Sequence, residues 1–159
     1  MKIYMSNGEL NQEQVYQIAR GGIKKLIERN NNANGKDPQT LSMLLEQISK
    51  TPLYVAVQKG SDVKNAKSIN FITLTIGGQV FIPVFTGPED FGKLKDSCDF
   101  VCMHPMDYFQ VLISKDRYAV INPFGSYFLM WPELIREHML PYMQECEEFK
   151  KKNEGQLPQ

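Results

Sequence analysis

The sequence predicts an α+β fold with an α/β-like order of elements: a mixed central β-sheet that contains a β-hairpin and is covered by helices. Two observations predict this class. Residues 69–86 alternate apolar side chains on both sides of Gly77-Gly78, which is typical of two antiparallel strands joined by a two-residue turn. On both sides of this hairpin, segments with the apolar period of helices alternate with short apolar runs that are typical of strands.

The individual elements follow from the same two periodicities. Apolar residues at positions i, i+3, i+4 and i+7 indicate helices, and alternation or a short apolar run indicates strands. In chain order the predicted elements are helices at about 11–29 and 38–50, a strand at 53–58, the hairpin at 69–86, a short helix ending at about 95, a strand at 100–103, a helix from 105, strands at 118–121 and 127–130, and a last helix from 132.

Capping residues set several of these boundaries. Asp37 is typical of an N-cap, and Pro38 is typical of a first helical position. Thr86 and Glu89 form the pattern of a capping box, which predicts the short helix after the hairpin. Pro132 begins the last helix in the same way as Pro38 begins the second.

The patterns also predict which side chains are buried. In the first helix one face is apolar and is expected to face the core: Val15, Ile18, Ala19, Gly22, Ile23, Leu26 and Ile27. In the hairpin, alternation places two sets of residues on opposite faces. The first set is expected to contact helices: Ile72, Leu74, Ile76, Phe81 and Phe85. The second set is expected to be partly solvated, and it includes Val80, Ile82 and Val84.

Composition excludes several classes of function. The 18 basic and 18 acidic side chains give zero formal net charge, so no overall attraction to nucleic acid or to an anionic membrane is expected. The N-terminal residues have no apolar signal segment, and no apolar run is long enough to span a membrane. Three cysteines without an export signal indicate reduced thiols, which predicts a cytoplasmic location.

Three segments of the middle of the chain carry a family resemblance. They are Pro52-Leu-Tyr-Val-Ala-Val57, Phe81-Ile-Pro-Val-Phe-Thr86 with Phe91 after it, and Ala119-Val-Ile-Asn-Pro123. In combination they resemble the N-terminal domain of the SseB family, which is named for an enhanced-serine-sensitivity phenotype. The resemblance implies an α/β or α+β domain of bacterial proteins, and it brings no catalytic residues.

The length and the resemblance together predict one domain over residues 1–159. We expect an SseB-like core at about 40–130. Outside it, we expect the N-terminal helix at about 11–29, a C-terminal helical extension at about 132–152, and a disordered tail at about 153–159.

Cys98, Cys102 and His104 are the chain's weak candidates for a metal site or a cysteine-dependent active site. Zinc takes thiolate and imidazole ligands, and a catalytic thiolate needs a base beside it. The set holds fewer than the four ligands of a structural zinc site, and Cys102 lies within an apolar run. We therefore interpret these residues as structural and predict neither a metal nor a cofactor.

Aromatic residues are concentrated near the end of the predicted core. Phe124, Tyr127 and Trp131 flank a loop-forming Gly125-Ser126 pair. Loops on a rigid scaffold often carry binding groups, and Tyr and Trp are enriched at interfaces. The predicted binding surface contains Asp107, Tyr108, Asn122, Phe124, Tyr127 and Trp131.

The sequence favours a non-enzymatic, cytoplasmic, protein-binding or regulatory module of a bacterium. The expected partner is an unidentified protein, with a homodimer as the alternative, and neither nucleic acid nor a membrane is expected. Two other interpretations remain open. One is a metal-binding or cysteine-dependent enzyme centred on Cys98, Cys102 and His104, and the other is a small-molecule sensor, with amino acids as the ligands that the family's name suggests.

Overall fold

The computed structural model describes residues 3–5, 13–60, 70–114, 116–139 and 141. Within them, seven strands form one mixed sheet in the order β1-β5-β2-β4-β6-β7, and β3 pairs with β4 beside this path. The pairs β1–β5 and β4–β6 are parallel, and the other pairs are antiparallel. The strands are β1 (Ile3–Met5), β2 (Leu53–Gln58), β3 (Leu74–Ile76), β4 (Gln79–Phe85), β5 (Cys98–Met103), β6 (Tyr118–Ile121) and β7 (Phe128–Met130).

The predicted hairpin is confirmed as β3 and β4. Ile76 pairs with Gln79 and Leu74 pairs with Phe81, which is the register that a Gly77-Gly78 turn requires. Both glycines have positive φ values, 58° and 82°, as the twisted two-residue hairpin turn demands.

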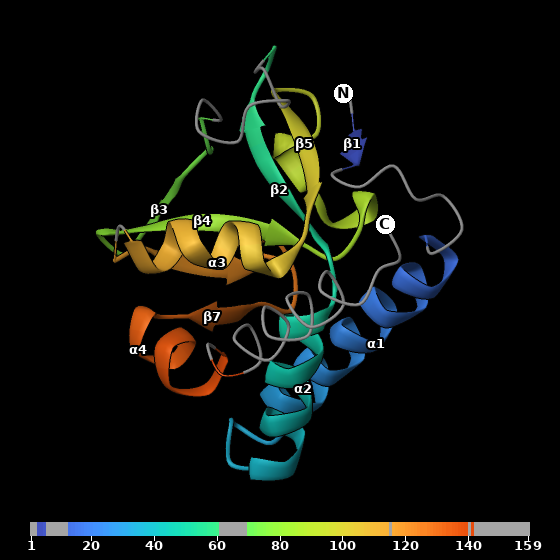
Figure 1. Ribbon diagram of the computed structural model, residues 1–159, viewed down its shortest axis with the longest axis vertical. Helices are drawn as coiled ribbons and strands as arrows, with labels where there is room; N and C mark the ends of the chain where they lie inside the picture. The colour runs from blue at the N-terminus through green and yellow to red at the C-terminus, as the bar shows by residue number, and fades with distance from the viewer. Residues whose placement is uncertain (1–2, 6–12, 61–69, 115, 140, 142–159) are drawn as a thin grey trace, which may run out of the picture.

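The helices lie on one face of the sheet. They are α1 (Glu13–Asn32), α2 (Pro38–Lys50), α3 (Pro105–Ser114) and α4 (Pro132–Leu134), and α4 continues into the π-helical turn η5 (Ile135–Met139). Figure 1 shows α1 and α2 side by side near one end of the sheet, and α3 contacts α2 and η5. This helix-covered mixed sheet confirms the predicted α+β class.

Asp37 is the N-cap of α2, as predicted. Its side chain accepts hydrogen bonds from the backbone nitrogen of Gln39 at 3.2 Å and from the hydroxyl of Thr40 at 2.6 Å. The bond from Gln39 satisfies a backbone donor at the helix start that has no partner within the helix, and the bond from Thr40 holds the Asp37 carboxylate in place.

Two buried clusters lie on opposite faces of the sheet. The helix-side core contains the buried hydrophobic residues that the helices contribute, together with Val55, Ile82 and Val84. The opposite core is formed by Tyr54, Ala56, Phe85, Phe91, Leu94, Cys98, Phe100 and Cys102. The face that contains Phe85 was expected to contact helices, and this prediction is wrong: the helices cover the face of Ile82 and Val84. Both faces of β4 are buried from Phe81 to Phe85, so alternation alone does not show which face the helices cover.

The prediction of a short helix after the hairpin is also wrong. Two separate 3₁₀ turns replace it, η3 (Pro88–Asp90) and η4 (Gly92–Leu94). Gly92 has φ +57°, outside the helical region, and a Cβ there would lie 2.5 Å from the Phe124 ring. Glycine at this position therefore ends the first turn and leaves room for Phe124.

Other differences concern the ends of the chain. The strand β1 was not predicted. The exposed fractions of Val15 (64%) and Ile18 (77%) show that the first part of the expected apolar face of α1 is solvated. The predicted tail at 153–159, and all but the first part of the extension at 132–152, lie outside the described residues. No helix in the described part of the chain has the length and apolar character that a membrane span requires.

Candidate functional site

The residues predicted to form a binding surface divide into two groups. Asp107, Phe124, Tyr127 and Trp131 are exposed, whereas Tyr108 and Asn122 are buried. Tyr108 and Asn122 therefore offer no side chain to a partner at the surface, and the prediction is corrected at these two positions.

Tyr108 faces the core because it lies on the inner side of α3. Its ring packs edge-to-face on Phe109, with the ring centroids 4.7 Å apart. Burial raises the pKa of its hydroxyl, which has no hydrogen-bond partner in the described residues. Asp107, the preceding residue, is exposed in the first turn of α3, where the helix dipole favours a carboxylate.

Asn122 joins the ends of two parallel strands. The backbone nitrogen of Thr86 donates to Asn122 Oδ1 at 3.0 Å, and Asn122 Nδ2 donates to the Thr86 hydroxyl at 2.9 Å. The φ of Asn122 is +53°, a conformation that asparagine tolerates better than most residues. The hydroxyl of Thr86 in turn donates to Asp90 Oδ2 at 2.8 Å.

The exposed aromatic residues lie at the end of the sheet that β7 forms. Alternation along β7 buries Phe128 and Met130 in the helix-side core and turns Leu129 to the opposite face. Tyr127 and Trp131 are exposed directly before and after this strand. Phe124 lies on the same face as Leu129, because its ring stacks on Phe85 of the opposite core at a centroid distance of 6.2 Å. We call Phe124, Tyr127, Leu129 and Trp131 the aromatic edge, and their exposed fractions are 40%, 52%, 38% and 43%.

Cys98, Cys102 and His104 are not brought together. Four residues of extended strand place the Cα atoms of Cys98 and Cys102 roughly 13 Å apart. Among the described residues, no three His, Cys, Asp or Glu side chains are grouped so that they could hold a metal ion. Burial raises the pKa of the Cys102 thiol to about 11, which disfavours the thiolate that a nucleophile requires.

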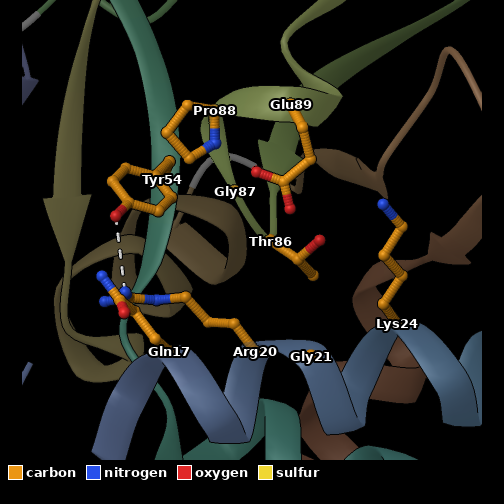
Figure 2. Close-up of a pocket in the computed structure, with 9 residues that line it drawn as sticks. All are labelled: Gln17, Arg20, Gly21, Lys24, Tyr54, Thr86, Gly87, Pro88 and Glu89. Atoms are coloured by element: carbon orange, nitrogen blue, oxygen red, sulfur yellow. Dashed lines mark hydrogen bonds between the residues drawn. The ribbon is translucent and has the colours of Figure 1, made fainter. Parts of the chain in front are cut away.

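A pocket that the sequence analysis missed lies between α1 and the segment that follows β4. Its volume is about 330 Å³, and Figure 2 shows the residues that line it: Gln17, Arg20, Gly21, Lys24, Tyr54, Thr86, Gly87, Pro88 and Glu89.

Arg20 forms one end of this pocket and is fixed by several contacts. Its guanidinium donates to the carbonyl of Pro52 at 2.8 Å, to Glu13 at 2.7 Å, to the Cys102 sulfur at 2.9 Å and to the Tyr54 hydroxyl at 3.4 Å. It also lies over the Tyr54 ring, 4.8 Å from the centroid. The pKa of Arg20 is raised: burial lowers it, but the hydrogen bond to Glu13 and nearby groups outweigh that effect.

Lys24 lies one helical turn after Arg20. Its ammonium is 2.7 Å from Asp90 Oδ1, and this hydrogen bond raises its pKa above the ordinary value. Because Asp90 also accepts from Thr86, a chain of hydrogen bonds runs from Lys24 through Asp90 and Thr86 to Asn122.

A feature of the sequence points to Arg20. It precedes Ile23 and Ile27 by three and seven residues, and both are fully buried, so all three share the inward face of α1. The charge of Arg20 favours the polar side of the helix, together with Lys24, Lys25 and Glu28, and this expectation is wrong for Arg20, which is buried.

Comparison with known protein families assigns most of the chain to one family. The family described as SseB protein N-terminal domain matches residues 30–137. This range contains all three segments that carried the resemblance, while α1 lies almost wholly outside it. Comparison with curated proteins and with solved structures gave no significant match.

Proposed function

Because this chain belongs to the SseB family through its N-terminal domain, we propose that it is a non-enzymatic, cytoplasmic protein-interaction module of a bacterium, and that its partner binds the aromatic edge. One observation carries the proposal. Four large apolar side chains in or near β7, Phe124, Tyr127, Leu129 and Trp131, are each more than a third exposed at one end of the sheet.

Rigid support favours binding at this surface. Phe128 and Met130 anchor β7 in the helix-side core, and Asn31 donates a hydrogen bond to the carbonyl of Tyr127 at 3.1 Å. Tyr and Trp held on such a scaffold lose little conformational entropy on binding, which is why they dominate interface energetics. The expected partner is a protein that presents apolar side chains to this edge.

The buried cysteines support a role without catalysis. Cys98 and Cys102 are only 3% and 2% exposed, and the raised pKa of Cys102 keeps it a thiol at neutral pH. A buried thiol of this kind behaves as a small apolar side chain.

The test compares two double variants that remove apolar surface from different faces. Tyr127→Ala/Leu129→Ala changes the aromatic edge. Val15→Ala/Ile18→Ala removes exposed apolar side chains of α1 and serves as the matched control. A partner captured with the wild-type protein is purified, and its affinity for each variant is measured by calorimetry, with thermal unfolding of each variant recorded in parallel.

We expect Tyr127→Ala/Leu129→Ala to lower the affinity for the purified partner at least tenfold, which corresponds to about 1.4 kcal/mol of binding free energy. The control variant should bind the partner as tightly as the wild type does. Equal affinity in both variants would refute the aromatic edge as the binding surface. Sedimentation of the wild-type protein and of Tyr127→Ala/Leu129→Ala identifies a homodimer, because a dimer formed through this edge dissociates in that variant alone.

A further inference from the structure

The pocket between α1 and residues 86–89 has walls of opposite charge. Arg20 and Lys24 extend from α1 on one side, and Glu89 extends from the opposite side with its carboxylate directed toward the helix (Figure 2). The wall formed by α1 precedes the residues that match the SseB family, whereas Tyr54 and residues 86–89 lie within them. The pocket is thus formed where an element outside the matched domain packs against it.

The cationic wall is fixed before any ligand arrives. The Arg20 side chain is 3% exposed and has hydrogen bonds to four different groups, so its position is set by the core. The Lys24 ammonium has three donors, and in the described residues Asp90 accepts one of them. Lys24 therefore retains donors for a second acceptor, and its charged end is already oriented.

The anionic wall depends on Gly87. A Cβ at this position would lie 2.5 Å from Glu89 Oε2, so the carboxylate occupies space that any other residue's side chain would take. No described residue donates a hydrogen bond to this carboxylate, and it is available to a donor from a ligand.

We propose that this pocket binds a small zwitterion, a molecule that carries an ammonium and a carboxylate group on one short carbon skeleton, as free α-amino acids do. The ammonium contacts Glu89, and the carboxylate accepts from the free donors of Lys24. The proposal rests on the pocket alone and is independent of the aromatic edge.

The charge pattern selects a zwitterion over a simple ion. Arg20 and Lys24 are already paired with Glu13 and Asp90, so the pocket offers a ligand the Glu89 carboxylate and the remaining donors of Lys24. An amine alone leaves the Lys24 donors unused, and a carboxylate alone leaves Glu89 without a partner and is repelled by it. A zwitterion aligned between the walls is attracted by both of them. The volume of about 330 Å³ admits a molecule of this size.

The test uses a panel of the free α-amino acids as probes. Each is compared with its N-acetyl derivative, which lacks the ammonium, and with its amide, which lacks the carboxylate. Binding is measured by titration followed by amide NMR shifts, with those of Gly21, Gly87 and Glu89 as the reporters of the pocket.

Two kinds of variant test the walls and the space. Glu89→Gln and Lys24→Met each remove one charge. Gly21 lines the pocket and a Cβ there meets open space, so Gly21→Leu places a side chain in the pocket. Gly22→Ala is the matched control, because a Cβ at Gly22 also meets open space but Gly22 does not line the pocket.

We expect at least one free amino acid to shift the pocket amides and both of its derivatives to bind at least tenfold more weakly. Affinity should fall at least tenfold in Glu89→Gln, Lys24→Met and Gly21→Leu and stay unchanged in Gly22→Ala. The proposal is overturned if no free amino acid shifts these amides, if either derivative binds equally well, or if Gly21→Leu binds as the wild type does.

Discussion

Thr86 and Asn122 exchange two hydrogen bonds at the ends of the parallel strands β4 and β6. Thr86 ends one of the family-like segments and Asn122 is the next-to-last residue of another, so residues 36 positions apart in two motifs meet at one buried contact. The same contact continues through Asp90 to Lys24, and it therefore links the strand ends to the pocket.

Replacing Asn122 with glycine should lower the free energy of unfolding by about 2 to 4 kcal/mol. Glycine tolerates the positive φ of this position, so the loss comes from the two buried hydrogen bonds with Thr86. Urea unfolding measures the effect. Asn34→Gly is the matched control, since Asn34 is exposed and has a φ of 54°, and this variant should change stability little. Equal effects of the two variants would show that the hydrogen bonds contribute nothing.

Replacing Arg20 with methionine should destabilise the protein by about 3 to 5 kcal/mol, because it leaves the partly buried Glu13 carboxylate and the Pro52 carbonyl without their donor. Chemical unfolding at neutral pH measures the change. The exposed Lys50–Glu46 pair offers a comparison, and Glu46→Gln should alter stability by less than about 1 kcal/mol. A small effect of Arg20→Met would mean that the pocket wall is not fixed as described.

Stability should fall as the pH rises from about 9 to about 11. Burial raises the pKa of Cys102 from 9.0 to about 11, so the unfolded chain loses this proton first and binds fewer protons than the folded chain over this range. The free energy of unfolding therefore decreases with pH, by up to about 2 kcal/mol from this group. The raised pKa values of Tyr54 and Lys24 act in the same direction.

Unfolding measured across this pH range in Cys102→Ser isolates the thiol. Serine keeps an acceptor for Arg20 but does not titrate in this range, so the free energy of unfolding should fall less steeply with pH in this variant. Curves of identical slope for the variant and the wild type would contradict the assignment to Cys102.

Two glycine-to-alanine changes should have opposite effects on the free energy of unfolding. Gly22→Ala should stabilise the protein by about 1 kcal/mol, because Gly22 lies within α1 and a Cβ there meets open space. Gly92→Ala should destabilise it by more than about 1 kcal/mol, because φ is +57° and the Cβ would collide with the Phe124 ring. Thermal and urea unfolding of both variants check the signs, and stabilisation by Gly92→Ala would exclude the described contact.

The elements with local signals were predictable from the sequence. Gly77-Gly78 defines the hairpin register by itself, and Asp37-Pro38 defines the start of α2. The strand β1 carries no such signal, because three residues are too few to show a period and the pairing partner lies almost a hundred positions away. Which face the helices cover was not predictable, since β4 is buried on both sides between Phe81 and Phe85.

The candidate site was predictable only in part, and for a related reason. The sequence pointed to Phe124, Tyr127 and Trp131 but did not separate exposed Tyr127 from buried Tyr108, because an aromatic side chain suits a core as well as a surface. The pocket depends on contacts between residues far apart in sequence, such as Arg20 with Cys102 and Lys24 with Asp90. No local pattern contains this information.

The parallel pairing of β1 with β5 has a consequence for association. Three residues, Ile3–Met5, cover one edge of a strand whose six residues are all buried. Without this short strand, the backbone donors and acceptors that β5 directs toward Ile3–Met5 would be free to pair with another chain. β1 thus protects this edge of the sheet from strand-to-strand association.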